Sequence, residues 1–205
     1  MIRAAKSEDA EALADLILTS APDPLAAIFD ITPELSALNF LSTSLAQGEG
    51  QYGYLNHWVI ELHEKVVGCV CAWHHNLAQS FHQSTLQVLT QFYGLEHSLA
   101  VMTSSLTMLD CVPKPAPHEW CIGHLSVVSD YKRKGIGQSL LALMQQLAIE
   151  AGKSHLSLDV ESNNHAALAF YKKQGFAIVN ESGVTERMAN LGIGEHLHLT
   201  KNIVA

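Results

Sequence analysis

The chain has 205 residues, of which 48% are apolar and 16% charged, and its formal net charge at pH 7 is -8. This composition excludes a disordered chain, and the excess of acidic residues disfavours nucleic-acid binding, which needs a concentrated basic surface. No stretch approaches the roughly 20 apolar residues that cross a bilayer, and the N-terminus lacks the apolar run of a signal peptide. We therefore expect a cytoplasmic protein with a single domain over residues 1–205 and with no membrane or nucleic-acid partner.

The N-terminal third predicts a short strand, two helices and a hairpin. Residues 2–4 have a strand pattern, and Ser7 with its acidic neighbours begins a helix that the proline at Pro22 ends. After a loop, leucines at three- and four-residue spacing over 35–45 indicate a second amphipathic helix. Two apolar runs within 57–73, joined by a polar turn, predict a pair of antiparallel strands.

The next segment predicts a helical insertion at about 76–112. Apolar residues recur at three- and four-residue steps over 86–93 and again over 95–109, which indicates a pair of helices. Their apolar face is a candidate lid over a substrate pocket, or a candidate interface of a homodimer. Four aromatic residues are candidates to line such a pocket, with packing in the core as the alternative for each: Tyr52, Tyr54, Trp58 and Trp73.

A strand over 120–128 leads into a glycine-containing turn and then into a helix that ends near Gly152. Gly135 and Gly137 let the backbone approach a ligand closely, and the free amides at a helix N-terminus favour a pyrophosphate. The basic run over 132–134 adds positive charge beside them. A turn in which the glycines provide only tightness explains the glycines alone equally well.

Two stretches together resemble the motifs of the GNAT superfamily of acetyl-CoA-dependent N-acetyltransferases. The string from Leu125 to Leu141 resembles the family's Arg or Gln, two residues, then Gly-x-Gly after its fourth strand, with Lys132 in the Arg or Gln position. The string from Leu156 to Phe176 resembles the second motif, which carries an asparagine, a tyrosine and a final Gly-Phe. Both motifs at this separation are far more specific than either alone.

The resemblance implies an α/β fold with a mixed, splayed sheet of about six or seven strands, flanked by helices and with the insertion on one side. It implies that acetyl-CoA is the acyl donor, that its pantetheine pairs with the backbone of Val127 like an added strand, and that an unidentified primary amine attacks directly. It assigns these residues to the acetyl-CoA site: Leu125, Val127, Lys132, Arg133, Lys134, Gly135, Ile136, Gly137, Gln138, Ser139, Asn164 and Tyr171.

The resemblance makes Tyr171 the general acid that protonates the departing thiolate. A phenol with an ordinary pKa near 10 keeps its proton at neutral pH and can transfer it to a thiolate. The alternative is a core tyrosine that seals the helix against the sheet. Asn164 begins the same helix, where its side chain either caps the first turn or reaches the cofactor.

An attacking amine must lose a proton, so the reaction needs a base. The candidates on the fourth strand are Glu119, His118 and His124. By strand alternation Glu119 shares a side with Val127, whereas the two histidines share the opposite side. We select Glu119 because acidic residues often serve this role in the family, with a solvated carboxylate at the strand end as the alternative.

The chain has twelve histidines and four cysteines, but their spacing does not match a structural zinc site, so we expect free thiols and no metal. A different class of function stays open, namely a non-catalytic acyl-CoA-binding sensor or interaction domain. Transfer of a longer acyl group is a third possibility, which depends on the depth of the pocket.

Overall fold

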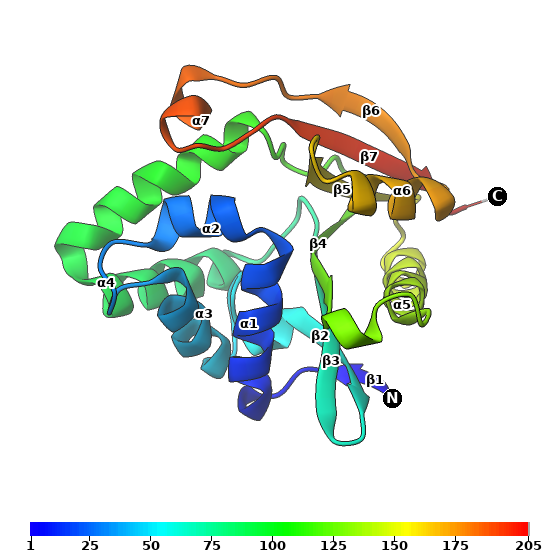
Figure 1. Cartoon of the computed structure of the whole chain (residues 1–205), viewed down its shortest axis with the longest axis horizontal. Coiled ribbons are helices and arrows are strands. Elements are labelled where there is room, and N and C mark those ends of the chain that lie inside the picture. The colour runs from blue at the N-terminus through cyan, green and yellow to red at the C-terminus, as the bar shows by residue number, and fades with distance from the viewer. Residues whose placement is uncertain (205) are drawn as a thin grey trace.

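Residues 1–204, the part of the chain that the computed structural model describes, are arranged around one mixed sheet of seven strands (Figure 1). The strands follow the order β1-β2-β3-β4-β5-β7-β6 along the sheet. Neighbours pair antiparallel, except β4 and β5, which run parallel. The strands are β1 (Ile2–Ala4), β2 (His57–Leu62), β3 (Lys65–Trp73), β4 (Glu119–Val127), β5 (His155–Glu161), β6 (Ala177–Glu181) and β7 (His196–Asn202).

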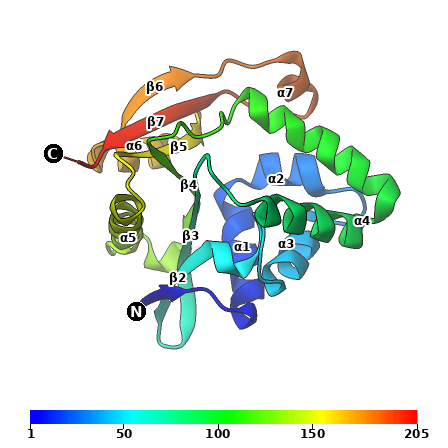
Figure 2. The same cartoon turned by 180° about the vertical axis from the view of Figure 1, so that it is seen from behind.

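Helices cover both faces of this sheet, which confirms the expected α/β architecture. They are α1 (Ala10–Ser20), α2 (Pro22–Phe29), α3 (Ala37–Ala46), α4 (Gln79–Thr107), α5 (Ile136–Glu150), α6 (His165–Lys173) and α7 (Glu186–Asn190). The first four lie on one side of β3 and β4, and α5 with α6 on the other, as Figure 2 shows from behind. The α1–α4 side encloses stacked aromatic rings, with the centroids of Phe29 and Phe40 4.8 Å apart.

The segment after Pro22 is a helix rather than the loop that the sequence predicts. Proline has no backbone N–H and therefore cannot continue α1. At the first position of a helix the backbone N–H has no partner within the helix, so its absence is harmless there, and the same residue ends one helix and begins the next. Within residues 1–204 no single helix is long and apolar enough to cross a membrane. The helices Ser7–Ser20 and Pro22–Phe29, which meet at a bend of 108°, together have the length and composition of a broken membrane span, and nothing beyond length and composition indicates one.

The insertion is helical, and the predicted pair of helices is confirmed. Gly94, with φ 70° and ψ 170°, interrupts α4 between the two apolar patterns. The face that packs on the core is, however, the one that carries Val88, Tyr93 and Val101. The apolar stripe of the second helix, which begins with Leu95, 75% exposed, lies on the outer surface. Periodicity therefore identified the buried face of the first helix, where Leu89 and Tyr93 are buried, but not that of the second.

The parallel pairing of β4 and β5 is short. It covers three residue pairs, from Glu119 opposite His155 to Cys121 opposite Ser157. β4 then continues for six residues and β5 for four without pairing to each other. The sheet is therefore splayed at its centre, as expected.

A β-bulge interrupts β4 beside this opening. The two-residue step from Cys69 to Cys71 in β3 lies opposite the three-residue step from Ser126 to Gly123 in β4. The extra residue bends the strand, and His124 adopts the left-handed region with φ 49°.

The bulge corrects our expectation that Glu119 shares a side with Val127. Ile122 and Val127 both pack in the cluster with α5, although five residues separate them and regular alternation would put them on opposite faces. Glu119, three residues before Ile122, therefore faces the α1–α4 side, opposite to Val127. His124 also faces that side, where its ring centroid lies 5.9 Å from that of Tyr52.

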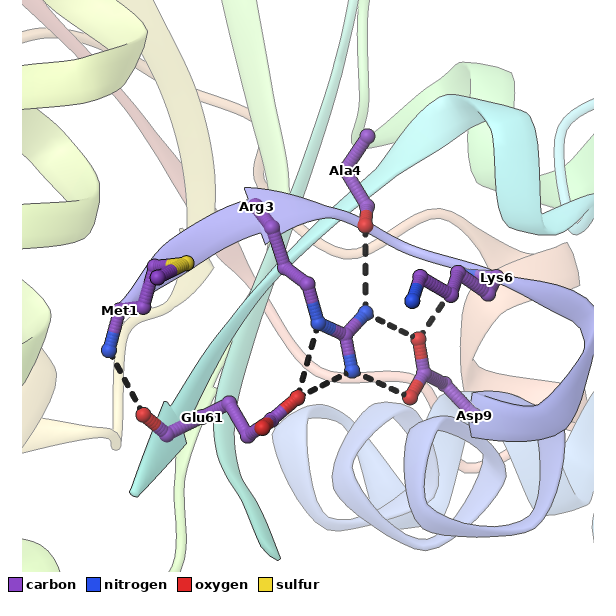
Figure 3. A network of polar contacts seen from close by, with 6 residues as sticks. All are labelled: Met1, Arg3, Ala4, Lys6, Asp9 and Glu61. Carbon is purple, nitrogen blue, oxygen red and sulfur yellow. Dashed lines mark hydrogen bonds and ion pairs between the residues drawn. The ribbon is translucent and has the colours of Figure 1, made fainter. Parts of the chain in front are cut away.

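An ion-pair network ties β1 to the start of α1 and to β2 (Figure 3). The guanidinium of Arg3 donates to both carboxylate oxygens of Asp9, at 2.6 and 2.9 Å, and to Oε2 of Glu61 at 2.7 Å. Asp9 also accepts the backbone N–H of Lys6 at 2.8 Å. The hydrogen bonds from Arg3 hold the pKa of Asp9 below its ordinary value.

We expect Asp9→Asn to lower the free energy of unfolding at pH 7 by about 2 kcal/mol, because Arg3 loses charge-assisted hydrogen bonds. A carboxyl whose folded pKa is depressed stabilises the fold above its unfolded pKa, about 4, and this contribution is lost as the pH falls through the folded pKa. Urea unfolding should therefore show the gap between wild type and variant closing as the pH is lowered from 7. The exposed Asp15→Asn in α1 is the control; a gap that persists unchanged at acid pH would contradict the ionic origin.

Candidate active site

Two cavities lie where β4 and β5 separate. The larger, which we call cavity A, has a volume of about 740 Å³ and lies between β5 and the α1–α2 segment. The second, cavity B, has a volume of about 720 Å³ and lies between β4, the loop before α5, and α6. They share six lining residues: Thr19, Ser20, Leu125, Asn164, Ala167 and Tyr171. The two spaces therefore meet along α6.

The segment from Tyr131 to Gln138, a loop that runs into the first turn of α5, forms one wall of cavity B. Gly135 adopts φ 83° at the position that caps α5, so the first free amides of this helix begin beside the cavity. Lys132 and Arg133 line the same wall and are exposed. Free amides at a helix N-terminus next to two full positive charges form a site for an anion such as a phosphate.

Gly137 lets the start of α5 pack close to β4 and α6. A Cβ at this position would lie 3.2 Å from Cζ of Phe170 on α6 and 3.7 Å from Cδ2 of Leu125 on β4. Both side chains line cavity B. A larger residue would therefore push into the space where the loop, β4 and α6 converge.

Cavity B gathers ten of the residues that the sequence assigns to the cofactor: Leu125, Val127, Lys132, Arg133, Gly135, Ile136, Gly137, Gln138, Asn164 and Tyr171. Lys134 and Ser139 do not line it. Nζ of Lys134 lies 5.0 Å from the ring centroid of Tyr131, and Oγ of Ser139 donates to the carbonyl of Gly135 at 3.2 Å. Sequence reasoning missed Phe170 and Gln174, although they share a helical face with Ala167 and Tyr171 at three- and four-residue spacing.

Tyr171 lies at the junction of the two cavities. Its side chain is buried against Phe170 and Phe176, with ring centroids 5.2 and 5.6 Å away. Burial raises the pKa of the Tyr171 hydroxyl above its ordinary value near 10. Asn164 accepts the backbone N–H of Ala167 at 3.1 Å, so the predicted cap of α6 is confirmed.

Cavity A has an acidic and aromatic lining. Three carboxylates line it, those of Asp23, Asp159 and Glu161, and no lysine or arginine among residues 1–204 does. Of the aromatic candidates from the sequence, Tyr52 and Trp73 line it, whereas Tyr54 and Trp58 do not. This cavity therefore carries the opposite charge to the loop of cavity B.

The three base candidates on β4 occupy different places. His124 lines cavity A, where burial lowers its pKa to about 3, so the ring is neutral at physiological pH. His118 and Glu119 line neither cavity. Glu119 is buried, accepts the backbone N–H of Ala116 at 2.8 Å, and lies 3.5 Å from Nε2 of His198. Its selection as the base stays a prediction.

The comparisons with known proteins agree with this arrangement. The sequence model of the acetyltransferase (GNAT) family matches residues 27–176. The chain belongs to this family. It is therefore an acyltransferase enzyme, and acetyl-CoA is the acyl donor.

Solved structures show the same fold at low sequence identity. An N-acetyltransferase from Staphylococcus aureus Mu50 is 22% identical over 98% of this chain and 99% of that chain, with a TM-score of 0.70. An acetyltransferase is 23% identical over 100% of both chains, with a TM-score of 0.64. Rv2747 from Mycobacterium tuberculosis, in complex with CoA and NLQ, is 15% identical over 100% of this chain and 99% of that chain, with a TM-score of 0.52. A comparison with curated proteins gives no match.

The residues of cavity B fit the donor of a GNAT enzyme. The free amides before α5 and the charges of Lys132 and Arg133 suit the phosphates of coenzyme A. The backbone of Val127 and the apolar side chains of Leu125 and Phe170 suit its pantetheine arm. Acetyl-CoA supplies the acetyl group as a thioester.

We expect Gly137→Val to weaken the binding of acetyl-CoA by at least about tenfold, because the new side chain enters the space between Phe170 and Leu125. Calorimetric titration with acetyl-CoA measures the Kd. The control is Ala142→Val, which adds the same branched side chain at an exposed position of α5. Equal affinity in the two variants would show that Gly137 does not shape the donor site.

Proposed function

We propose that this GNAT enzyme moves an acetyl group from acetyl-CoA to a primary amine by direct attack, with Tyr171 as the general acid. One observation carries the assignment. Among residues 1–204, Tyr171 is the only ionisable side chain that lines both cavities, so it stands where a donor in cavity B and an acceptor in cavity A would meet.

The surroundings of Tyr171 support its role. Because burial raises its pKa, the hydroxyl is protonated at neutral pH and is present as a hydrogen-bond donor to the departing sulfur. Leu125 also lines both cavities and follows the bulge of β4, where the ladder with β3 is interrupted.

The same proposal covers the location and extent of the enzyme. The four cysteines Cys69, Cys71, Cys111 and Cys121 are buried free thiols, which supports a reducing compartment and thus the cytoplasm. All strands of residues 1–204 belong to one sheet, which supports a single domain.

The first test is a titration with acetyl-CoA, followed by measurement of thiol release over a panel of primary amines. We expect acetyl-CoA to bind without an acceptor, and free thiol to appear together with an acetylated amine. Failure to bind acetyl-CoA would overturn the proposal. Binding with acyl transfer to hydroxyl acceptors rather than to amines would overturn the acceptor class.

We expect Tyr171→Phe to lower kcat by about 10²- to 10³-fold and to leave the Kd for acetyl-CoA within about threefold, because the ring still packs while the proton donor is lost. Steady-state thiol release and calorimetry measure the two quantities. Tyr54→Phe is the control, since it removes a hydroxyl outside both cavities. An unchanged kcat in Tyr171→Phe would remove Tyr171 from the role of acid.

A further inference from the structure

Asp159 is a buried carboxylate with one oxygen that lacks a partner. It is on β5, lines cavity A, and its side chain is 4% exposed. Oδ1 lies 2.8 Å from Nδ1 of His198, which pairs with it across β5 and β7. Oδ2 is buried, and no residue of the described range 1–204 donates a hydrogen bond to it. An unpaired buried carboxylate oxygen is unfavourable unless something outside the fold completes it.

His198 connects Asp159 to a second carboxylate, that of Glu119. Its Nε2 lies 3.5 Å from Oε1 of Glu119, so the imidazole stands between two carboxylates. The hydrogen bond to Asp159 and the two negative charges raise the pKa of His198, and the imidazolium can donate to both partners. Neither His198 nor Glu119 lines a cavity, whereas Asp159 does. The series of contacts from Glu119 through His198 to Asp159 therefore ends in cavity A.

Other titratable groups also face Asp159. Glu161 follows it on the same face of β5, and His196 lies opposite Glu161 on β7. Cys111 and Cys121 lie near it on the side of α4 and β4, and burial raises the pKa of both thiols, so they stay protonated. Burial is also the main cause that raises the pKa of Asp159, and the nearby His198 opposes it.

The rest of cavity A selects for a cation with an apolar body. Among residues 1–204 its three carboxylates share the lining with no lysine or arginine, so cavity A favours a cationic ligand over an anionic one. Its walls include the apolar or aromatic side chains of Leu25, Ile28, Tyr52, Trp73 and Met108.

We propose that Oδ2 of Asp159 binds the ammonium group of the acceptor and removes its proton, that His198 and Glu119 position Asp159, and that the acceptor is an alkylamine with an apolar body. This inference rests on the proposed amine acetylation. It gives Glu119 an indirect role and assigns the base to a residue that the sequence motifs do not mark.

The protons balance in this scheme. The ammonium passes one proton to Oδ2 of Asp159, and the neutral amine forms a C–N bond with the acetyl carbon as the C–S bond breaks. The thiolate takes the proton of Tyr171, and the second proton lost by the nitrogen restores the Tyr171 hydroxyl. Asp159 then releases its proton to solvent, so each turnover frees one proton, one thiol and one amide.

Binding tests the acceptor class without turnover. The protein saturated with coenzyme A is titrated with three matched probes: hexylamine, 6-aminohexanoate and hexanoate. We expect hexylamine to bind at least about tenfold more tightly than the other two, and Asp159→Asn to remove that preference. Asp15→Asn is the control, which removes the same charge from an exposed position of α1.

The outcomes separate this inference from the proposed function. Hexanoate binding as tightly as hexylamine, an unchanged affinity for hexylamine in Asp159→Asn, or no probe binding to protein that binds coenzyme A would overturn the inference alone. Failure to bind coenzyme A would overturn both.

Kinetics test the proton transfer. With hexylamine as acceptor, Asp159→Asn should lower kcat/KM by at least about 100-fold while the Kd for acetyl-CoA stays within about threefold. His198→Gln removes the cation that stabilises the Asp159 carboxylate, so the pKa of Asp159 rises and the acidic limb of the pH profile should move to higher pH. An acidic limb that does not move in His198→Gln would overturn the positioning role, even if Asp159→Asn fails to fold.

Discussion

The active site depends on how briefly β4 and β5 pair. Beyond Cys121 and Ser157 the two central strands leave each other, so their backbone groups face an opening instead of a ladder. Such groups need partners, and at the centre of a sheet only a ligand, solvent or a flanking side chain can provide them. The helix α6 follows β5 along this opening and brings Tyr171 to the point where both cavities meet. A fully paired sheet of the same composition would have neither cavity.

Charge is distributed over this opening in a way that the net charge of -8 does not reveal. Cavity B has the exposed Lys132, Arg133 and Lys173 together with the amides before α5, whereas cavity A has Asp159 and two further carboxylates. An anionic donor and a cationic acceptor are therefore attracted from opposite sides. Electrostatics alone would then orient the two reactants toward Tyr171.

Local patterns predicted those parts of the fold that local forces determine. The hairpin turn, where His63 and Glu64 both have positive φ, and the break of α4 at Gly94 are set by neighbouring residues, and both lie where the sequence indicated. The motifs located most of cavity B because its basic residues and glycines lie close together in one short stretch of the sequence, 132–137. The start of α2 at Pro22 was missed because proline is favourable at a helix N-terminus and unfavourable inside a helix, and the sequence pattern alone did not reveal which applies.

Cavity A was not predictable in the same way because its residues meet only through long-range contacts. The bulge at His124 adds one residue that no periodicity marks, and it reverses the face of every position before it. Asp159 lies in β5, where polar and apolar residues alternate, and it is paired with His198, 39 residues away. An unpaired oxygen in such a place lowers stability by roughly 1–3 kcal/mol. Proteins tolerate unfavourable groups of this kind mainly where function requires them. His198 pairs with Oδ1 of Asp159, and His124, which is neutral, adds no positive charge to cavity A. Oδ2 is therefore left to pair with a donor that enters from solvent, which in the proposed reaction is the ammonium group of the acceptor.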